Sequence, residues 1–364
     1  MNKLLRNTDS FIRKVRMSNM KYLLVEGESD SKILKQLLKR FRDNNLIKKD
    51  KVEVQSAQYI KSNKDTIQGN RHKVEYISKN INKENFAYRF VGFVDREFRD
   101  FLIDKTIRDI ISSHKVSSRL VWSRGHSIEN YFFDQDVLKL YCANASFKLD
   151  YYELIEERFQ FLYLSILNLS TILSLLAKEL NEKYELSFEE IENSISFEFL
   201  EIENNQIIIK IDEWLERLKN KIKNKIESTD ISSEDFLKET RIIYNDICSI
   251  VSLTEDPDTK KFICHGHLGL HCVIEAYKKC LIVVSEEAIK NQIEQINENV
   301  TNSKRRKKDK KIQELINFSK DYTKSLIHLG WLDTIQRKSD LTNNSESSNI
   351  FPLEILRLLD LINI

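Results

Sequence analysis

The sequence is poor in the two residues that most often interrupt regular secondary structure. Its 364 residues include only 7 glycines and 2 prolines. Because glycine and proline mark turns and short strands, their scarcity argues against an all-β protein and favours long uninterrupted helices. An internal repeat and a low-complexity linker are also absent, so the chain is expected to fold into ordinary globular domains with their own cores.

Features of exported and membrane proteins are scarce as well. The 5 cysteines are odd in number and unevenly spaced, as expected of reduced thiols. Residues 1–7 lack the apolar core of a signal peptide. No run of about 18 uncharged apolar residues occurs, so a membrane span is not expected. The sequence therefore predicts a cytoplasmic protein.

An excess of charge of one sign is also missing. The 58 basic and 56 acidic residues give a net charge of +2, so any contact with nucleic acid must come from local patches. One such patch is residues 304–311, in which seven of eight positions are basic. Phosphate binding and a solvated helix start or loop both remain open for it. Its candidate nucleic-acid contacts are Lys304, Arg305, Arg306, Lys307 and Lys308.

The first 150 residues do contain an alternation of strand-like and helix-like segments. Apolar runs typical of strands cover residues 22–25, 52–55, 88–95 and 119–122, and helical periodicity covers residues 31–41 and 72–81. Strands separated by helices predict a parallel sheet with helices on both faces. We therefore predict an α/β domain over residues 1–150.

The remainder, residues 151–364, is predicted to be mainly helical and to serve dimerisation, substrate binding or partner binding. Helical periodicity covers residues 151–183, 211–225, 233–251, 268–297 and 310–329, with a short strand at residues 207–209.

Carboxylates follow the first and third predicted strands. Glu26 ends the first strand, and Asp30 lies one helical turn later, after a turn that Gly27 permits. Asp95 and Glu97 end the third strand, and side chains two residues apart in an extended chain share one face. Paired carboxylates repel each other unless a cation lies between them or one of them is protonated, so a divalent metal is one interpretation. The other interpretation is structural: these carboxylates cap a helix or lie in a solvated turn.

A third polar cluster follows the fourth strand. Ser127 precedes a segment with apolar residues on one helical face and is predicted to cap it. Glu129 would then lie in the first turn, beside His126. For this histidine a hydrogen-bonded structural role is the default, with a catalytic or metal-binding role as the alternative.

In this order, the three clusters resemble the TOPRIM domain. The matching segments are Val25-Glu26-Gly27-x-x-Asp30, Val94-Asp95-Arg96-Glu97 and His126-Ser127-Ile128-Glu129-Asn130-Tyr131. The likeness is to the OLD-like branch found in bacterial anti-phage systems, such as the effectors of PARIS-type systems, and it covers about the first 135 residues. It implies a Rossmann-like parallel sheet with flanking helices and the activity of a Mg²⁺-dependent nuclease.

The resemblance also implies roles for the five carboxylates. Glu26 would bind metal or act as general base or acid, and Asp30 matches the acidic residue one helical turn later. Asp95 matches the firmest metal ligand. Glu97 falls where the wider family has aspartate, and Glu129 corresponds to a ligand for a second metal. Oxygen-only ligation suits Mg²⁺ or Mn²⁺ and argues against zinc.

Nucleases of this branch also use a basic residue near the scissile phosphate. The sequence does not choose among the candidates Arg96, Arg124, His126 and Lys261.

A separate zinc site is the remaining alternative in the helical region. Cys264, His267, His271 and Cys272 lie close in sequence, and the two histidines are four residues apart on a predicted helix. The spacing lacks a clean pair of metal-binding elements, and buried core cysteines are the commoner explanation.

The resemblance finally implies a toxic effector that an AAA- or ABC-type ATPase on a separate chain (AriA-like) holds and releases. The chain itself has no Walker A pattern, which fits that division. The implied substrate is tRNA, whose cleavage would arrest translation. A DNA endonuclease and a TOPRIM scaffold or sensor without catalysis are the alternatives. A homodimer is expected because related TOPRIM nucleases pair.

Overall fold

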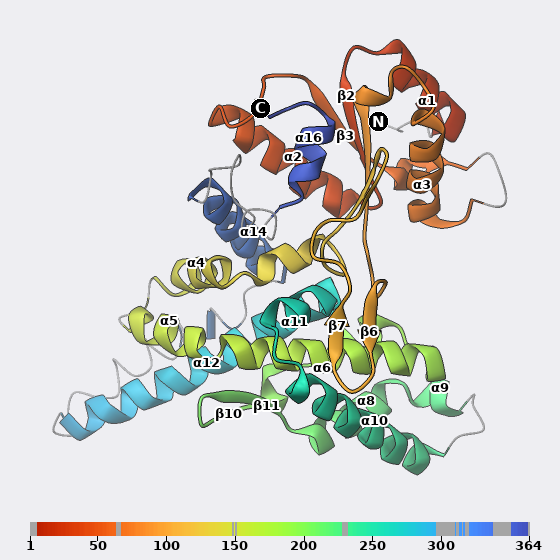
Figure 1. Cartoon of the computed structure of the whole chain (residues 1–364). Helices are drawn as coiled ribbons and strands as arrows, with labels where there is room; N and C mark the ends of the chain where they lie inside the picture. Colours follow the sequence, from red (N-terminus) through yellow and green to blue (C-terminus); the bar gives the residue numbers. More distant parts are fainter. Residues whose placement is uncertain are drawn as a thin grey trace. The chain divides into compact units, whose positions relative to one another are not determined.

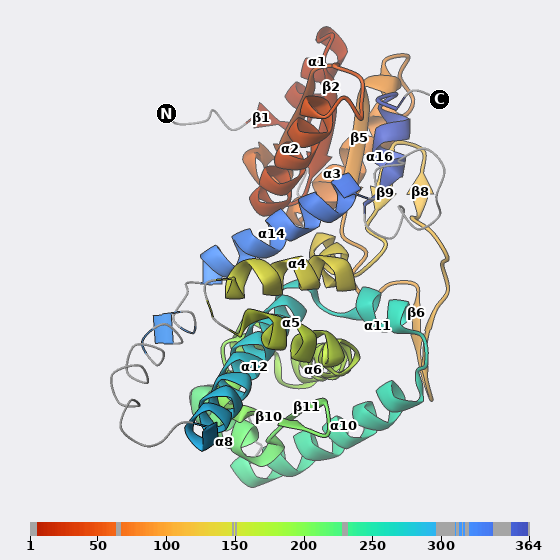
Figure 2. The ribbon, with the colours of Figure 1, turned by 90° about the vertical axis from the view of Figure 1, so that its left-hand side faces the viewer.

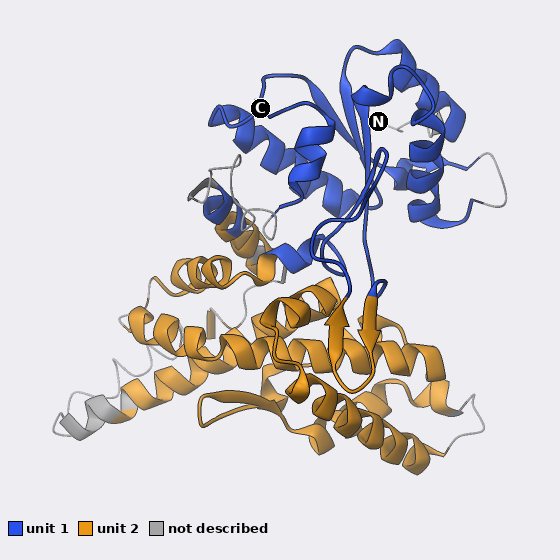
Figure 3. Ribbon diagram, in the orientation of Figure 1, with its two compact units in different colours: residues 1–100, 110–131, 331–364 blue, residues 101–109, 132–330 orange. Residues whose placement is uncertain are grey.

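The computed structural model describes residues 6–62, 67–147, 149, 151–227, 232–295, 310, 313, 314, 316, 320–337 and 351–362. The chain forms two compact units (Figure 3). Unit 1 consists of residues 1–100, 110–131 and 331–364, and unit 2 consists of residues 101–109 and 132–330.

These boundaries differ from the single division predicted at residue 150. The N-terminal part of unit 1 ends at Tyr131. The C-terminal residues 331–364 also belong to unit 1. The ring of Phe351 packs edge-on against that of Phe41 in unit 1, with 5.6 Å between centroids. Apolar periodicity shows that a segment is buried, but it does not show which distant segment covers it, so the sequence could not reveal that residues 331–364 belong to unit 1.

Unit 1 is built on a five-stranded sheet with the order β3-β2-β5-β9-β8. The first four strands are parallel and β8 is antiparallel, which confirms a mixed α/β unit with a parallel-stranded sheet. The central strand β5 is buried at every position, as the continuous apolar run predicted. The strands are β2 (Lys21–Val25), β3 (Val52–Ser56), β5 (Phe90–Val94), β8 (Val116–Ser117) and β9 (Leu120–Trp122).

Helices cover both faces of this sheet because alternate strand residues point to opposite sides. Figure 1 shows α1 (Thr8–Met17) and α3 (Gly69–Ile81) on one side, and α2 (Glu28–Asp43) and α16 (Leu353–Leu358) on the other. Tyr22, Leu24 and Phe90 form a buried cluster with the apolar side chains of α1 and α3. Gly92 lies where α3 crosses β5, and a Cβ there would fall 2.8 Å from Val74 Cγ1.

Short elements complete unit 1. Strand β1 (Arg6–Asn7) pairs in parallel with β4 (Ile60–Lys61). The 3₁₀ helices are η1 (Ala57–Tyr59), η2 (Ala87–Arg89) and η3 (Ile128–Phe133). Helix α14 (Lys320–Arg337) leads back into this unit from unit 2.

Unit 2 is mainly helical, as predicted, and is organised around α6 (Tyr163–Tyr184). Figure 2 shows α6 surrounded by other helices, and it contacts α10, α11 and α12. The predicted helical stretch from residue 151 divides at Leu162, where α5 ends and α6 begins. The other helices are α4 (Gln135–Ser146), α5 (Tyr152–Phe161), α7 (Phe188–Glu192), α8 (Ile211–Lys221), α9 (Lys223–Glu227), α10 (Ser233–Leu253), α11 (Pro257–Ile263) and α12 (Gly266–Gln295), with the 3₁₀ helix η4 (Phe197–Phe199).

Two antiparallel hairpins belong to unit 2. One is formed by β10 (Leu200–Glu203) and β11 (Gln206–Ile209), which confirms the predicted short strand at residues 207–209. The other, β6 (Phe101–Ile103) and β7 (Ile107–Asp109), was not expected from the sequence.

Helix α6 is long and apolar enough to cross a membrane by length and composition. However, 61% of its most apolar window is buried inside the structure. Its apolar side chains therefore serve the core of unit 2, as in a soluble protein.

Candidate active site

The acidic residues singled out from the sequence gather at one edge of the sheet of unit 1. Glu26 directly follows β2, and Asp95 directly follows β5. Because neighbouring parallel strands end at the same edge, their following residues lie side by side, where open α/β sheets bind ligands. The backbone N–H of Asp95 donates to Glu26 Oε1 over 2.9 Å, which ties the two strand ends together.

Glu26 has an unusual protonation equilibrium. Its pKa is raised to about 7, first because burial disfavours the charged form. The hydrogen bond from Asp95 and the charge of Arg71 oppose this shift, whereas repulsion from Asp30 and Glu97 adds to it. The carboxyl group therefore changes its charge close to neutral pH.

Asp30 is held at the start of α2. The helix begins at Glu28, three residues earlier than predicted, with Gly27 as its N-cap. The Gly27 N–H donates to Asp30 Oδ2 over 3.0 Å, so this carboxylate fixes the turn that follows Glu26. Asp30 therefore both caps α2 and belongs to the acidic group.

Asp95 is the centre of the acidic group. Burial raises its pKa well above the usual range, and repulsion adds further to the shift. In decreasing order, the repelling carboxylates are those of Asp30, Glu26, Glu129 and Glu97. The other four predicted carboxylates therefore all act electrostatically on Asp95.

Glu97 does not share a strand face with Asp95 as predicted, because β5 ends at Val94. Glu97 has a φ of 57°, in the left-handed region, so the two-residue alternation of a strand does not extend to it. Its N–H donates to the carbonyl of His126 over 2.8 Å. Its carboxylate pairs with Arg71 at 3.0 Å and with Arg99 at 3.4 Å.

Glu129 is buried in η3, the 3₁₀ helix that follows β9. Ser127 Oγ donates to Glu129 Oε2 over 2.7 Å, and the Ser127 N–H donates to Asn130 Oδ1 over 2.7 Å. A Cβ on Gly125 would fall 2.5 Å from Asn130 Cβ, so only glycine fits this turn. The segment therefore places Glu129 through a chain of local hydrogen bonds.

Among the predicted basic candidates, Arg96 has a different role. It is fully buried and donates to the backbone carbonyls of Arg99, Asp100 and Arg124, each over 2.8 Å. Its guanidinium thus satisfies carbonyl groups of the segments that follow β5 and β9, and we do not assign it to a phosphate.

The other three candidates are also buried. The backbone N–H of Arg124 donates to Tyr131 Oη over 2.9 Å, and the His126 ring packs edge-on against Phe98 at 4.7 Å between centroids. Lys261 belongs to α11 in unit 2, where its ammonium lies 3.8 Å from Asp134 Oδ2.

Arg71 is a basic residue of the site that the sequence analysis missed. It lies on α3, and its Nη1 donates to Glu97 Oε2 over 3.0 Å while its Nε donates to Glu75 Oε1 over 2.9 Å. Its Nη2 is buried and has no hydrogen-bond partner within the described part of the chain. The only sequence signal is the spacing of Arg71 and Glu75, which is typical of a pair on a helix surface.

The arrangement has the donor chemistry of a Mg²⁺ or Mn²⁺ site, since its ligands are carboxylate oxygens. In the described ranges, no three His, Cys, Asp or Glu side chains converge closely enough to hold an ion as they stand. The carboxylates of Asp30, Glu26, Glu129 and Glu97 nevertheless all act electrostatically on Asp95.

The cysteines and histidines of the zinc alternative have other partners. Cys264 Sγ donates to the carbonyl of Lys260 over 3.1 Å, and burial raises its pKa to about 12, so it stays a thiol at neutral pH. Burial also raises the pKa of Cys272, and the ring of His271 lies 3.0 Å from the carbonyl oxygen of Ile195. Cys264 and Cys272 belong to the core of unit 2, whereas His267 is exposed.

The basic run Lys304, Arg305, Arg306, Lys307 and Lys308 lies outside the described residues. Comparison with protein-family models finds no match to the chain, and no curated protein matches it.

Proposed function

We propose that this chain is a Mg²⁺-dependent TOPRIM-type nuclease whose active site lies at the carboxyl edge of the unit 1 sheet. The observation that carries the proposal is the group of carboxylates around Asp95, whose pKa is raised first by burial and then by the four other carboxylates. Buried carboxylates that repel one another weaken a fold unless a bound cation or the uptake of a proton offsets the repulsion. Their positions after β2, β5 and β9 match the order of the acidic residues in the TOPRIM pattern.

The chain's own residues divide the work of phosphodiester hydrolysis. Asp30, Asp95, Glu97 and Glu129 supply oxygen ligands. Bound Mg²⁺ would activate a water and stabilise the leaving oxygen. Glu26, whose pKa of about 7 suits proton transfer near neutrality, supplies a further ligand or accepts the proton of that water at a carboxylate oxygen.

Arg71 supplies the basic group. Its two ion pairs fix the plane of the guanidinium, and the remaining nitrogen, Nη2, has no partner in the described part of the chain. A phosphate oxygen is the acceptor that such an N–H group suits best. Arg71 would therefore orient the scissile phosphate against the carboxylates.

The resemblance to OLD-like defence nucleases supplies the biological setting of the proposal. The chain would be a toxic effector that a separate ATPase restrains, and its substrate would be tRNA. It would act as a homodimer, since a folded RNA or a duplex offers two positions for cleavage. Light scattering of the isolated chain at micromolar concentration should give twice the mass of 43.1 kDa, and a monomer would refute the dimer.

Cleavage of tRNA and supercoiled plasmid by the purified full-length chain tests the reaction. With Mg²⁺ we expect tRNA cleavage that EDTA abolishes and that Asp95→Asn lowers by about 10²-fold or more. Asp43→Asn is the matched control, because Asp43 is an exposed carboxylate at the other end of the helix that holds Asp30.

Each outcome distinguishes one of the candidate functions. Cleavage of the plasmid alone would make the chain a DNA endonuclease. An Asp95→Asn variant as active as wild type would refute the assigned site. A chain that binds nucleic acid but cleaves neither substrate, with Mg²⁺ or Mn²⁺ present, would be a scaffold or sensor.

A further inference from the structure

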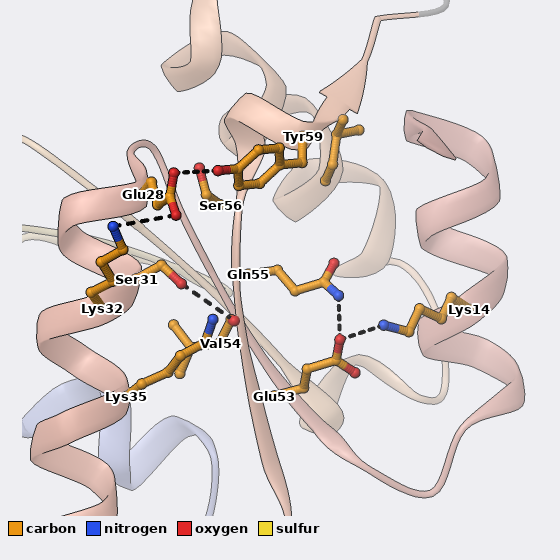
Figure 4. A pocket seen from close by; sticks show the side chains of 11 residues that line it. Lys14, Glu28, Ser31, Lys32, Lys35, Glu53, Val54, Gln55, Ser56 and Tyr59 are labelled. Atoms are coloured by element: carbon orange, nitrogen blue, oxygen red, sulfur yellow. Dashed lines mark hydrogen bonds and ion pairs between the residues drawn. The ribbon is translucent and has the colours of Figure 1, made fainter. Parts of the chain in front are cut away.

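A cavity of about 590 Å³ opens beside the edge strand β3 of unit 1 (Figure 4). Strand β3 forms its floor. Helix α2 lines one side with Ser31, Lys32 and Lys35, and α1 lines the opposite side with Lys14. Three ammonium groups therefore surround one cavity, and neither the sequence analysis nor the proposed active site uses them.

The cavity is a direct neighbour of the carboxylate site. Ser56, at the end of β3, lines the cavity, and its Oγ donates to the backbone carbonyl of Glu26 over 3.1 Å. Glu28, two residues after Glu26, is also part of the lining. A chain that occupies the cavity would thus pass on to the edge where Glu26 lies.

The two carboxylates of the lining are already neutralised. Glu28 accepts a hydrogen bond from the Tyr59 hydroxyl and pairs with Lys32 at 3.4 Å. Glu53 pairs with Lys14 at 2.6 Å. Each carboxylate therefore has its own cation inside the cavity.

Lys35 is the third lysine of the lining, and neither Glu28 nor Glu53 pairs with it. It is exposed, and among the described residues it has no ion pair or hydrogen bond. It lies one helical turn beyond Lys32 on the same side of α2. Lys35 is therefore the lysine best placed to pair with an anion in the cavity, with Lys32 one turn away.

We propose that this cavity binds a phosphate group of single-stranded nucleic acid, next to the phosphodiester that the carboxylate site cleaves. The inference rests on the proposed function for the position of the cut, but not for the binding itself. A volume of about 590 Å³ is in the range of small-ligand pockets, so the cavity has room for one nucleotide of a strand. Lysine ammonium groups that track a backbone are typical of sites for single strands.

Equilibrium binding of the full-length chain in EDTA tests the proposal without cleavage. The probes are short fluorescein-labelled oligouridylate and oligothymidylate, followed by anisotropy between about 50 and 200 mM salt. Lys35→Glu should weaken binding about tenfold and reduce the slope of log affinity against log salt by about 0.7, the value of one phosphate contact on a single strand. Lys39→Glu is the matched control, because it makes the same change on an exposed lysine of α2 that does not line the cavity.

The possible outcomes separate the cavity from the nuclease. Equal affinity of the Lys35→Glu and Lys39→Glu variants would overturn the cavity site, even if Asp95-dependent cleavage were found. A selective loss in the Lys35→Glu variant would support it, even if neither nucleic acid were cleaved. Competition by inorganic phosphate as strong as that by the oligonucleotides would overturn the assignment to a strand. The stronger of the two probes identifies RNA or DNA as the source of the phosphate.

Discussion

Glu26 combines partial burial with a pKa near 7, and this has a consequence for stability. A carboxyl group whose pKa is higher in the folded than in the unfolded state binds its proton more tightly when folded. The stability that it contributes is present below its ordinary pKa of 4.5 and is lost as the pH rises towards about 7. Without a cation, the ionised Glu26 should therefore weaken the folded state above neutral pH.

We expect Glu26→Gln to unfold at higher temperature than wild type at pH 8 in EDTA, and at a similar temperature near pH 4.5. The difference at pH 8 should be on the order of 1–3 kcal/mol in the free energy of unfolding. Thermal unfolding followed by circular dichroism measures it. Mg²⁺ should raise the wild-type midpoint more than that of the variant. A variant less stable than wild type at pH 8 would contradict the assigned pKa.

Arg71 permits a sharp comparison because Arg99 contacts the same carboxylate. Arg71→Met should lower kcat/KM for nucleic-acid cleavage by about 10²-fold, mainly through kcat, since its Nη2 would act on the phosphate during reaction. Arg71→Lys should recover part of the loss because it keeps the charge but not the two fixed ion pairs. Arg99→Met also removes an ion pair with Glu97, from a half-exposed side chain. Equal losses in the two methionine variants would show that Arg71 acts only through Glu97.

The site residues that could be predicted from the sequence lie mostly at the ends of strands. Glu26 and Asp95 could be located because an apolar run followed by a carboxylate marks the carboxyl end of a buried strand. The orientation of Glu97 could not be predicted from the sequence. Its left-handed backbone is accompanied by a hydrogen bond to His126, a residue that follows another strand. Arg71 was missed because its partner Glu97 is distant in sequence.

At the scale of elements, the contact of α3 with β5 determines where Arg71 lies. Gly92→Ala would place a Cβ 2.8 Å from Val74 Cγ1 and closer still to Ser78 Oγ, both on α3. The helix would have to move away from the strand, at a cost of about 1–3 kcal/mol. Urea unfolding measures this cost. Because α3 carries Arg71, cleavage should fall by more than the loss of folded protein explains. A variant with wild-type stability would show that α3 packs less closely than the structure describes.

Secondary-structure elements with a clear hydrophobic periodicity could be predicted from the sequence, whereas most of the very short elements could not. The four parallel strands and the helices between them follow from apolar runs and helical spacing, although α2 begins earlier than expected because Gly27 and Asp30 form its cap. Strands β6, β7 and β8 contain two or three residues each, too few to show an alternation. Asn7 is the N-cap of helix α1, and its side-chain oxygen accepts a hydrogen bond from the Ser10 N–H.

At the scale of the whole molecule, the C-terminal segment completes the sheet unit. The Lys48 N–H donates to the Leu361 carbonyl over 2.8 Å, and Arg119 Nη1 donates to the Leu358 carbonyl over 2.9 Å. His114 Nδ1 lies 3.1 Å from a carboxylate oxygen of Glu354. Unit 1 therefore depends on contacts that no fragment ending at residue 150 contains.

Phe351→Ala tests this dependence. Phe351 is buried and packs against Phe41, so its truncation should lower the free energy of unfolding by about 3–5 kcal/mol. Leu329→Ala is the control, since Leu329 is half-exposed and should change stability by about 0.5 kcal/mol or less. Urea unfolding followed by tryptophan fluorescence measures both. Equal, small effects would mean that the C-terminal segment is dispensable.

The interleaving of the two units also fixes the order in which the protein can mature. A ribosome completes the strands of the five-stranded sheet and the β6–β7 hairpin of unit 2 first, then the rest of unit 2, and only then residues 351–362. At about 5–20 residues per second, the sheet waits tens of seconds for its last covering segment. If the chain is the tRNA nuclease proposed above, this delay would leave unit 1 incomplete while unit 2 is being made. A partner that binds during translation would then meet unit 2 before unit 1 is complete.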